Sequence, residues 1–174
     1  PLLIWNDNNL YCFWSDNRTG HYQLFMATTG GDQSATITVD YGQDWNLVGL
    51  PLEVEDASYN SLFPESIDGT LYSFDDGYNL ETSLIQGEGY WLRFNNAGST
   101  TITGVSINEL TISLNEGWNL ISGITNAFHS SHIHDPDGLI IPGTIYGFTP
   151  NGYSEAEILY PGKGYWIRAN NSGN

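Results

Sequence analysis

The sequence has very few basic residues and almost no cysteine. Its 174 residues include four lysines and arginines against 20 aspartates and glutamates, which gives a formal net charge of −16 at pH 7. Nucleic-acid binding depends on clustered basic side chains, so this composition excludes DNA and RNA as expected partners. The single cysteine, Cys12, cannot form a disulfide within the chain. The fold must therefore be stabilised by packing rather than by cross-links.

Long apolar runs are also absent. No stretch approaches the roughly 18 apolar residues that a membrane-spanning helix needs, so we expect no membrane insertion. No secretory signal is visible, and the chain begins with Pro1 rather than Met, so we expect it to be a piece of a longer protein. The scarcity of lysine in an acidic chain suits an extracellular or cell-surface location.

The residues that are plentiful favour β structure. Twenty glycines and seven prolines divide the chain into short segments, which are rich in tyrosine, tryptophan, isoleucine and threonine. Hydrophobic residues make up 40% of the chain, enough for a packed core. We therefore predict an all-β protein.

Four blocks of sequence occur twice in the same order, which indicates an internal duplication. We place repeat 1 at residues 35–106 and repeat 2 at residues 107–174. The paired blocks are 44–48 (DWNLV) and 117–121 (GWNLI), 69–74 (GTLYSF) and 143–148 (GTIYGF), 77–78 and 152–153 (both GY), and 87–96 (GEGYWLRFNN) and 162–171 (GKGYWIRANN).

Each repeat is predicted to be a small antiparallel β-sandwich or barrel, and the two stand in tandem. Only residues 56–63 look helical, with Asp56 as a cap and Pro64 as the end. We expect Trp45 and Trp118, in matching strands, to be largely buried. The other predicted strands are 35–39, 69–74, 89–95 and 100–103 in repeat 1, and 110–114 with the matching blocks in repeat 2.

Residues 1–34 belong to neither repeat and are predicted to form a β-hairpin with a third strand. The run from Trp14 to Gly20 (WSDNRTG) resembles part of one blade of a secreted β-propeller. This segment is too short to bury its own apolar side chains, so we expect its strands to add to a sheet edge, either in the same chain or in a neighbouring copy. A head-to-tail contact of this kind builds a filament. The residues expected to carry this self-association are Leu3, Trp5, Tyr11, Phe13 and Trp14.

The duplicated blocks resemble a group of bacterial extracellular repeats with the pattern Gly-Trp-Asn-Leu-Ile-Ser, Tyr-x-Phe and Pro-Gly-Lys-Gly-Tyr-Trp-Ile. Such repeats lie near the C-terminal ends of large secreted proteins, many of which are exported by the type IX route. The resemblance covers residues 35–174 and implies a non-catalytic module without catalytic residues. The best matches are residues 117–122 and 161–167, and residues 44–49 and 87–92 match with departures at Asp44, Val48, Gln86 and Glu88.

One histidine-rich segment, residues 129–137 (HSSHIHDPD), is the nearest approach to a metal site. His129, His132, His134 and Asp135 offer nitrogen and oxygen ligands for zinc or calcium. Their spacing matches no established motif, and Asp-Pro and Asp-Gly are ordinary turn formers. We favour a polar loop and expect no cofactor, with a zinc or calcium site as the alternative.

A Trp-x-Arg pair occurs in both repeats, at Trp91 and Arg93 and again at Trp166 and Arg168. Residues two apart on a strand share a face, so each guanidinium is expected to lie over its neighbouring indole. If these indoles are exposed they offer stacking platforms for a polysaccharide. The simpler expectation is that each tryptophan is buried against a loop or the adjacent repeat, with Tyr90, Leu92 and Phe94 facing the core.

These patterns favour a non-catalytic structural or adhesive module of a secreted bacterial surface protein, self-assembling through its N-terminal strands. Its expected partners are further copies of the chain or neighbouring domains. The alternative is a carbohydrate-binding module of an exported hydrolase that uses Trp91 and Trp166. Catalytic motifs such as a nucleophile elbow or a zinc-protease helix are missing, so we expect no enzyme activity.

Overall fold

The computed structural model describes residues 2–6, 9–16, 23–29 and 34–173. Nearly all of its regular structure is β-strand, and the sheets are antiparallel, which confirms the prediction of an all-β protein. The chain divides into two compact units, Pro1–Ser34 and Ala35–Asn174. Within the described ranges, no helix is long and apolar enough to cross a membrane.

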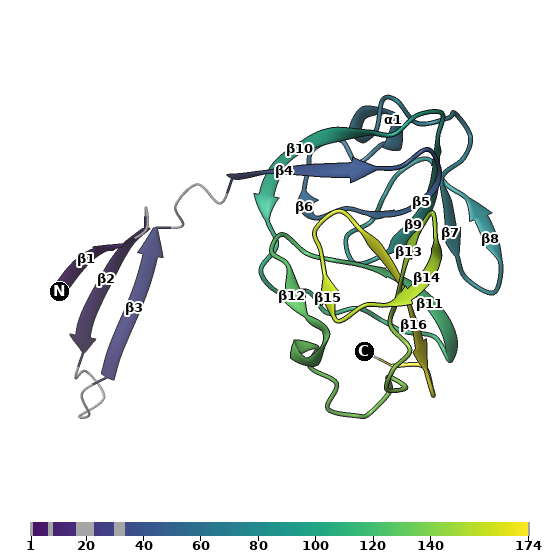
Figure 1. Cartoon of the computed structure of the whole chain (residues 1–174). Helices are drawn as coiled ribbons and strands as arrows, with labels where there is room; N and C mark the ends of the chain where they lie inside the picture. The colour runs from purple at the N-terminus through teal and green to yellow at the C-terminus, as the bar shows by residue number, and fades with distance from the viewer. Residues whose placement is uncertain (1, 7–8, 17–22, 30–33, 174) are drawn as a thin grey trace. The chain divides into compact units, whose positions relative to one another are not determined.

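The first unit is a three-stranded antiparallel meander (Figure 1). Strand β2 (Asn9–Asp16) lies between β1 (Leu2–Asn6) and β3 (Gln23–Thr29) and is hydrogen-bonded to both. The strand that carries Tyr11, Phe13 and Trp14 is therefore paired on both edges within this unit, which leaves β1 and β3 as the outer strands. Strand β1, which carries Leu3 and Trp5, has an outer position in this sheet. The side chains of this unit lie outside the described part of the structure.

The second unit contains two four-stranded sheets with the same strand order. Repeat 1 supplies the order β5-β9-β7-β8 and repeat 2 supplies β11-β16-β13-β14, so the duplicated blocks occupy equivalent places. The strands are β5 (Asp44–Gly49), β7 (Tyr72–Phe74), β8 (Tyr78–Leu80) and β9 (Gly89–Phe94), and then β11 (Gly117–Ser122), β13 (Tyr146–Thr149), β14 (Gly152–Glu155) and β16 (Gly164–Ala169).

The asparagine of each Trp-Asn-Leu block fastens the turn that precedes its strand. Asn46 Oδ1 accepts a hydrogen bond from Gly42 N at 2.8 Å, and its Nδ2 donates to Gly42 O at 2.9 Å. Asn119 makes the equivalent pair of bonds with Asn115, at 2.8 and 2.9 Å. The residue that starts each strand has a positive φ, 72° at Asp44 and 96° at Gly117. Glycine and aspartate tolerate this conformation, which explains the residue types that precede tryptophan.

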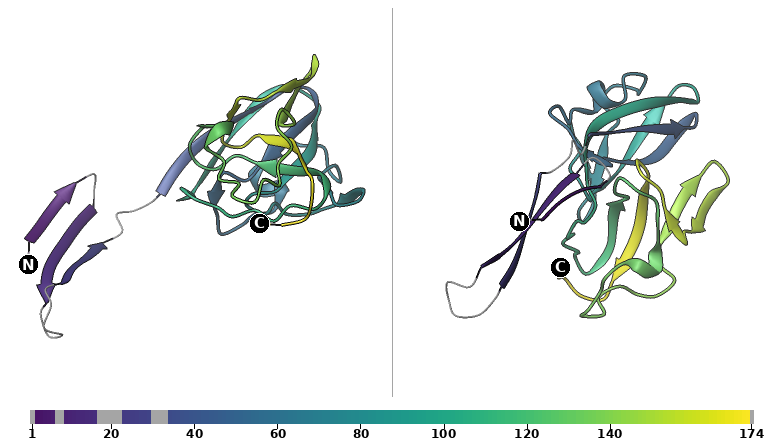
Figure 2. Two further views of the ribbon diagram at one scale, coloured as in Figure 1. Left: turned by 90° about the horizontal axis from the view of Figure 1, so that it is seen from below. Right: turned by 90° about the vertical axis from the view of Figure 1, so that its left-hand side faces the viewer.

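Repeat 1 has an additional layer that repeat 2 lacks. Strands β4 (Ser34–Tyr41), β10 (Gly98–Ser106) and β6 (Leu52–Glu53) form a separate sheet, in which β4 and β10 lie side by side (Figures 1 and 2). Helix α1 (Tyr59–Leu62) is shorter than predicted. Asp56 precedes the helix and accepts hydrogen bonds from Ser58 N and Ser61 Oγ, at 2.9 and 2.5 Å.

The strand predicted at residues 110–114 is absent, and this prediction was wrong. Leu114 alone forms a bridge, with Gly173, at N···O distances of 2.7 and 3.0 Å. In repeat 1 the equivalent strand β4 is hydrogen-bonded to β10, whereas in repeat 2 only Gly173 forms a bridge with this segment. The remaining elements of repeat 2 are a short pair, β12 (Phe128–His129) with β15 (Ile158–Leu159), and a 3₁₀ turn, Ser130–His132.

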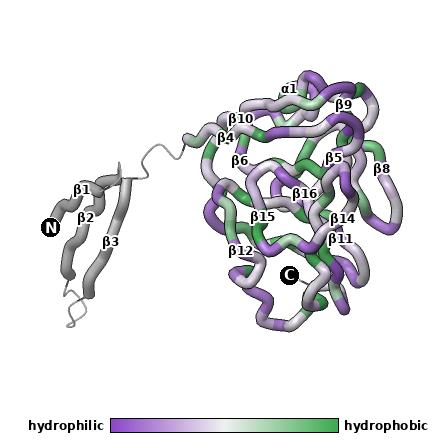
Figure 3. Tube along the Cα trace, viewed as in Figure 1, coloured by the Kyte–Doolittle hydropathy of each residue, from purple (hydrophilic) through white to green (hydrophobic). Residues whose placement is uncertain are grey.

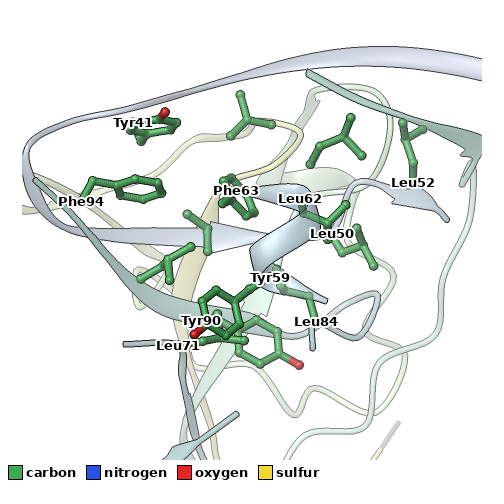
Figure 4. Packing of buried hydrophobic residues seen from close by; sticks show 14 residues of the cluster. Tyr41, Leu50, Leu52, Tyr59, Leu62, Phe63, Leu71, Leu84, Tyr90 and Phe94 are labelled. Carbon is green, nitrogen blue, oxygen red and sulfur yellow. The ribbon is translucent and has the colours of Figure 1, made fainter. Parts of the chain in front are cut away.

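Each repeat has its own hydrophobic core on one face of its sheet. In repeat 1 the ring of Tyr41 stacks on Phe94 with centroids 3.8 Å apart, and Phe63 meets Phe94 edge-on (Figure 4). In both repeats the predicted core face of the Gly-Tyr-Trp strand is buried, which confirms that prediction. Hydrophilic positions occur along the strands as well as in the loops of this unit (Figure 3). The core of repeat 2 contains fewer buried residues, namely Leu114, Ile121, Leu159, Tyr165, Ile167 and Ala169.

Candidate binding site

The opposite faces of the two four-stranded sheets pack against each other. Leu47 and Trp91 of repeat 1 meet their equivalents Leu120 and Trp166 of repeat 2 in a third hydrophobic cluster. Both tryptophans are buried, with 8% and 9% of their surface exposed. The simpler expectation for them, burial against the adjacent repeat, is therefore confirmed.

The contact between the repeats is reciprocal, as in a symmetric dimer. Val48 forms a backbone bridge with Lys163, and its equivalent Ile121 forms one with Glu88, the equivalent of Lys163. A surface that contacts its own copy in this way is related to it by a twofold axis. The two repeats therefore form one unit about a pseudo-twofold axis.

Gly49 and Ser122 mark this axis because they are equivalent residues in direct contact. A Cβ atom added to Gly49 would lie 2.1 Å from the Cβ of Ser122, closer than two carbon atoms can approach. Only one of the two positions can therefore carry a side chain. The Ser122 hydroxyl is buried without a hydrogen-bond partner among the described residues.

The repeats also exchange an aromatic ring. Phe74 on β7 packs edge-on against Trp166 of repeat 2, with centroids 4.9 Å apart. Its equivalent Phe148, on β13, packs against Trp91 of repeat 1 at 4.8 Å. This is the role of the phenylalanine in the duplicated Tyr-x-Phe block, because residues two apart on a strand share a face. Each buried tryptophan is thus covered in part by a ring from the other repeat.

This exchange creates two equivalent aromatic clefts. Cleft 1 has a volume of about 470 Å³ and cleft 2 of about 500 Å³, within the roughly 300–1,000 Å³ of typical small-molecule sites. Every side chain lining them is aromatic. Cleft 1 is lined by Trp45, Tyr72, Tyr78, Trp91 and Phe148, and cleft 2 by their equivalents Trp118, Tyr146, Tyr153, Trp166 and Phe74.

The outer wall of each cleft is an exposed tryptophan, contrary to the sequence prediction. Trp45 is 37% exposed and Trp118 is 41% exposed, so the expectation that both are buried was wrong. Each stands edge-on to the buried indole of its cleft, at 6.3 Å from Trp91 and 6.2 Å from Trp166. Both lie at the start of their strands, where the face toward the other repeat is only partly covered.

The two arginines of the Trp-x-Arg pairs lie over these outer indoles. Arg93 Cζ is 5.8 Å from the ring centroid of Trp45, and Arg168 Cζ is 5.9 Å from that of Trp118. The expectation that they stack on Trp91 and Trp166 was therefore wrong. Cross-strand pairing decides the outcome, since Trp45 lies directly opposite Arg93 and Trp118 opposite Arg168.

The surroundings of the two guanidinium groups differ. Arg93 Nε forms an ion pair with Asp44 Oδ1 at 2.6 Å. The equivalent of Asp44 is Gly117, and Arg168 has no carboxylate partner among the described residues. Each arginine places its positive charge against the outer indole of its cleft. This charge disfavours the binding of a second cation to the same ring.

The polar atoms of the clefts are free to bind a ligand. Among the described residues, no hydrogen-bond partner is found for the hydroxyl groups of Tyr72, Tyr78, Tyr146 and Tyr153 or for the indole N–H groups of the clefts. Ser122 Oγ is the one completely buried side-chain polar atom without a partner in this part of the chain, so the N–H groups of Trp91 and Trp166 are not fully shielded from solvent. Each cleft thus combines ring faces with unpaired donors.

The structure gives no support to a metal site at the histidines. In the described ranges, no three histidine, cysteine, aspartate or glutamate side chains converge on a common point. His129 Nδ1 accepts a hydrogen bond from Ser131 N, and the rings of His129 and His132 are 6.2 Å apart. Asp135 accepts hydrogen bonds from two backbone N–H groups, of Leu139 and Ile140, which lower its pKa. The Asp135 carboxylate therefore fastens a loop rather than binding a metal with the histidines.

No protein-family model matches the chain, and no match is found among curated proteins or solved structures. The resemblance to extracellular repeats remains an expectation drawn from the duplicated blocks.

Proposed function

We propose that this chain is a non-catalytic adhesive module of a secreted bacterial surface protein, with residues 35–174 as its binding unit. The observation that carries the proposal is the pair of equivalent, open aromatic clefts. Exposed aromatic rings supply large contact area at low conformational cost and are enriched where proteins bind partners. A purely structural contact between the repeats would not require the outer tryptophans Trp45 and Trp118 to stay exposed.

The second candidate is a carbohydrate-binding module of an exported hydrolase. It is favoured by the same clefts, but through the exposed Trp45 and Trp118 rather than through the buried Trp91 and Trp166. The buried pair would contribute the floor of each cleft and one N–H donor each. The two candidates differ in the protein of which the module is a part. In both, the ligand binds to the aromatic rings of the clefts.

Binding to immobilised polysaccharides and to bacterial surfaces tests the proposal. We expect the full chain to be retained and the double variant Trp45→Ala/Trp118→Ala to lose retention. Tyr160→Ala is the matched control, because Tyr160 is an aromatic residue 52% exposed that lines neither cleft. Equal retention of all three proteins would rule out the clefts as the adhesive surface.

Filament formation through residues 1–34 remains part of the proposal. The outer strands β1 and β3 supply backbone groups that a neighbouring copy can pair with. Light scattering and electron microscopy of the full chain beside a chain starting at Ser34 test this point. We expect only the full chain to assemble, and equal behaviour of the two would remove the self-assembly from the proposal.

A further inference from the structure

We propose that the unit Ala35–Asn174 is bivalent, with cleft 1 and cleft 2 holding two separate chains of an uncharged polysaccharide and thereby cross-linking them. The inference rests on the proposed adhesive function and adds the class of ligand and the number of chains bound. It follows from three features of the clefts: their separation, their charge and their symmetry.

The clefts are two complete sites and not two ends of one. Each has its own outer indole, its own buried indole and two tyrosines from a single repeat. The space between them is filled by the cluster of Leu47, Trp91, Leu120 and Trp166, with the exchanged Phe74 and Phe148 packed against it. Because the partition is solid, a ligand in one cleft leaves the other free.

The charges around the clefts favour a ligand with no net charge. An anionic polymer would be repelled by a chain of formal charge −16. A cationic group would seek the faces of the outer indoles, where Arg93 and Arg168 already lie at 5.8 and 5.9 Å. An uncharged ligand meets neither obstacle.

The lining favours sugar rings among uncharged ligands. A pyranose has apolar C–H faces that pack on aromatic rings, and a rim of hydroxyl groups that needs donors and acceptors. Each cleft offers both, since its five rings carry two tyrosine hydroxyls and two indole N–H groups without protein partners. A purely apolar ligand would leave those groups without hydrogen bonds, which costs binding free energy.

The pseudo-twofold relation decides how many chains bind. A polysaccharide has a direction, from its non-reducing to its reducing end. A straight chain continues from one site to the next by translation, whereas the clefts are related by rotation, as the reciprocal bridges of Val48 with Lys163 and Ile121 with Glu88 show. One straight chain cannot therefore enter both clefts in the same orientation, and two chains are joined instead.

Isothermal titration calorimetry tests the number of sites with the full chain. The probes are uncharged hexasaccharides of β-1,4-glucan, β-1,3-glucan, β-1,4-mannan and β-1,4-xylan, with an oligogalacturonate as the acidic comparison. We expect at least one uncharged probe to bind with two sites per chain. Trp45→Ala and Trp118→Ala should each reduce this number to one, and Tyr160→Ala should leave it at two. Both substituted tryptophans are exposed, so circular dichroism should show unchanged folding.

Aggregation of beads coated with the cognate polysaccharide tests cross-linking directly. Wild-type chain should aggregate the beads, whereas either single-tryptophan variant should bind them without aggregating them. Aggregation that persists in both variants would assign cross-linking to residues 1–34 and overturn the inference.

The remaining outcomes separate the inference from the proposed function. One site per wild-type chain would overturn bivalency, and binding of oligogalacturonate alone would overturn the ligand class, while the adhesive function would stand in both cases. Retention of the wild-type chain on bacterial surfaces without binding of any sugar would also reject the ligand class alone. If the wild-type chain bound neither a sugar nor a bacterial surface, the proposed function would be rejected as well.

Discussion

Repeat 1 and repeat 2 build the same sheet with different amounts of supporting structure. Both have four strands in the same order, an asparagine that fastens the first strand and a tryptophan buried at the interface. Repeat 1 adds the three-stranded sheet β4-β10-β6 and helix α1, while repeat 2 covers its smaller core mainly with loops.

This difference distinguishes the duplicated blocks from the segments outside them. The blocks coincide with the strands, turns and rings that form the interface and the clefts. The segments outside the blocks form the structures that cover each core, and these structures differ between the repeats. Sequence similarity between the repeats therefore follows the shared contact surface more closely than the two cores. The expected effects of substitutions at equivalent positions can test this interpretation.

The largest effect is expected at the axis. Gly49→Ser places a second side chain where Ser122 already lies, so we expect a loss of about 3 kcal/mol in the free energy of unfolding. The exchanged double variant Gly49→Ser/Ser122→Gly carries one side chain at the axis again and should recover most of that loss. Urea denaturation measures both. A double variant no more stable than Gly49→Ser would contradict the twofold relation.

The exchanged rings should show equal effects from the two repeats. Phe74→Ala and Phe148→Ala each remove a half-buried ring from an indole edge, and we expect each to cost about 2 kcal/mol. Thermal and urea unfolding of the two variants measure the difference between them. A large loss of stability for one variant and none for the other would show that the two ring contacts, although similar in geometry, differ in energy.

The next pair of effects, at the equivalent tyrosines of the two cores, is expected to be unequal. The Tyr90 hydroxyl accepts from Ile85 N at 3.0 Å and donates to Glu88 Oε2 at 2.7 Å, whereas the Tyr165 hydroxyl accepts from Tyr160 N at 2.7 Å. We expect Tyr90→Phe to cost about 2 kcal/mol and Tyr165→Phe about 1 kcal/mol. Equal costs in urea denaturation would mean that the Glu88 contact adds nothing.

The same tyrosines predict the response of the protein to alkaline pH. Burial, reinforced by Glu88, raises the pKa of Tyr90, and burial raises that of Tyr165. A raised pKa in the folded state favours the neutral phenol. The resulting stability is present below the ordinary tyrosine pKa of about 10 and is lost as pH rises above it. Unfolding followed between pH 8 and 11 should show this loss, and Tyr90→Phe should reduce its slope above pH 10.

The smallest effect is a gain in stability at Ser122. Its buried hydroxyl has no partner in the described part of the chain, so Ser122→Ala removes an unsatisfied polar group without changing the backbone. We expect a gain of about 0.5–1 kcal/mol in urea denaturation. A loss of stability would indicate that the hydroxyl has a hydrogen-bonding role in solution.

The sequence predicted the strands better than it predicted their surroundings. Alternation along residues 89–94 correctly assigned Tyr90, Leu92 and Phe94 to the core, because one face of that strand is fully covered. The exposure of Trp45 could not be predicted, since it depends on how far the other repeat extends across the sheet. The strand expected at residues 110–114 has the right alternation, but no partner strand pairs with it.

The clefts themselves were not predicted, although their residues lie in the duplicated blocks. Trp45 and Tyr72 share a cleft with Phe148, which is distant in sequence and belongs to the other repeat. The duplication of Tyr-x-Phe was the available signal. Its meaning depends on the twofold arrangement of the repeats, which strand periodicity within one repeat does not encode.

Lys163 gives the interface a chemical reporter. It is the only lysine of the chain, its side chain is half-buried, and its ammonium group donates to the carbonyl of Asp40 in repeat 1. Burial lowers its pKa, so a larger fraction of the amine is unprotonated at a given pH. Acylation requires the amine to leave the carbonyl of Asp40, so the contact between the repeats at this point slows the reaction. The rate of acylation, followed by mass spectrometry, therefore measures how often this contact opens.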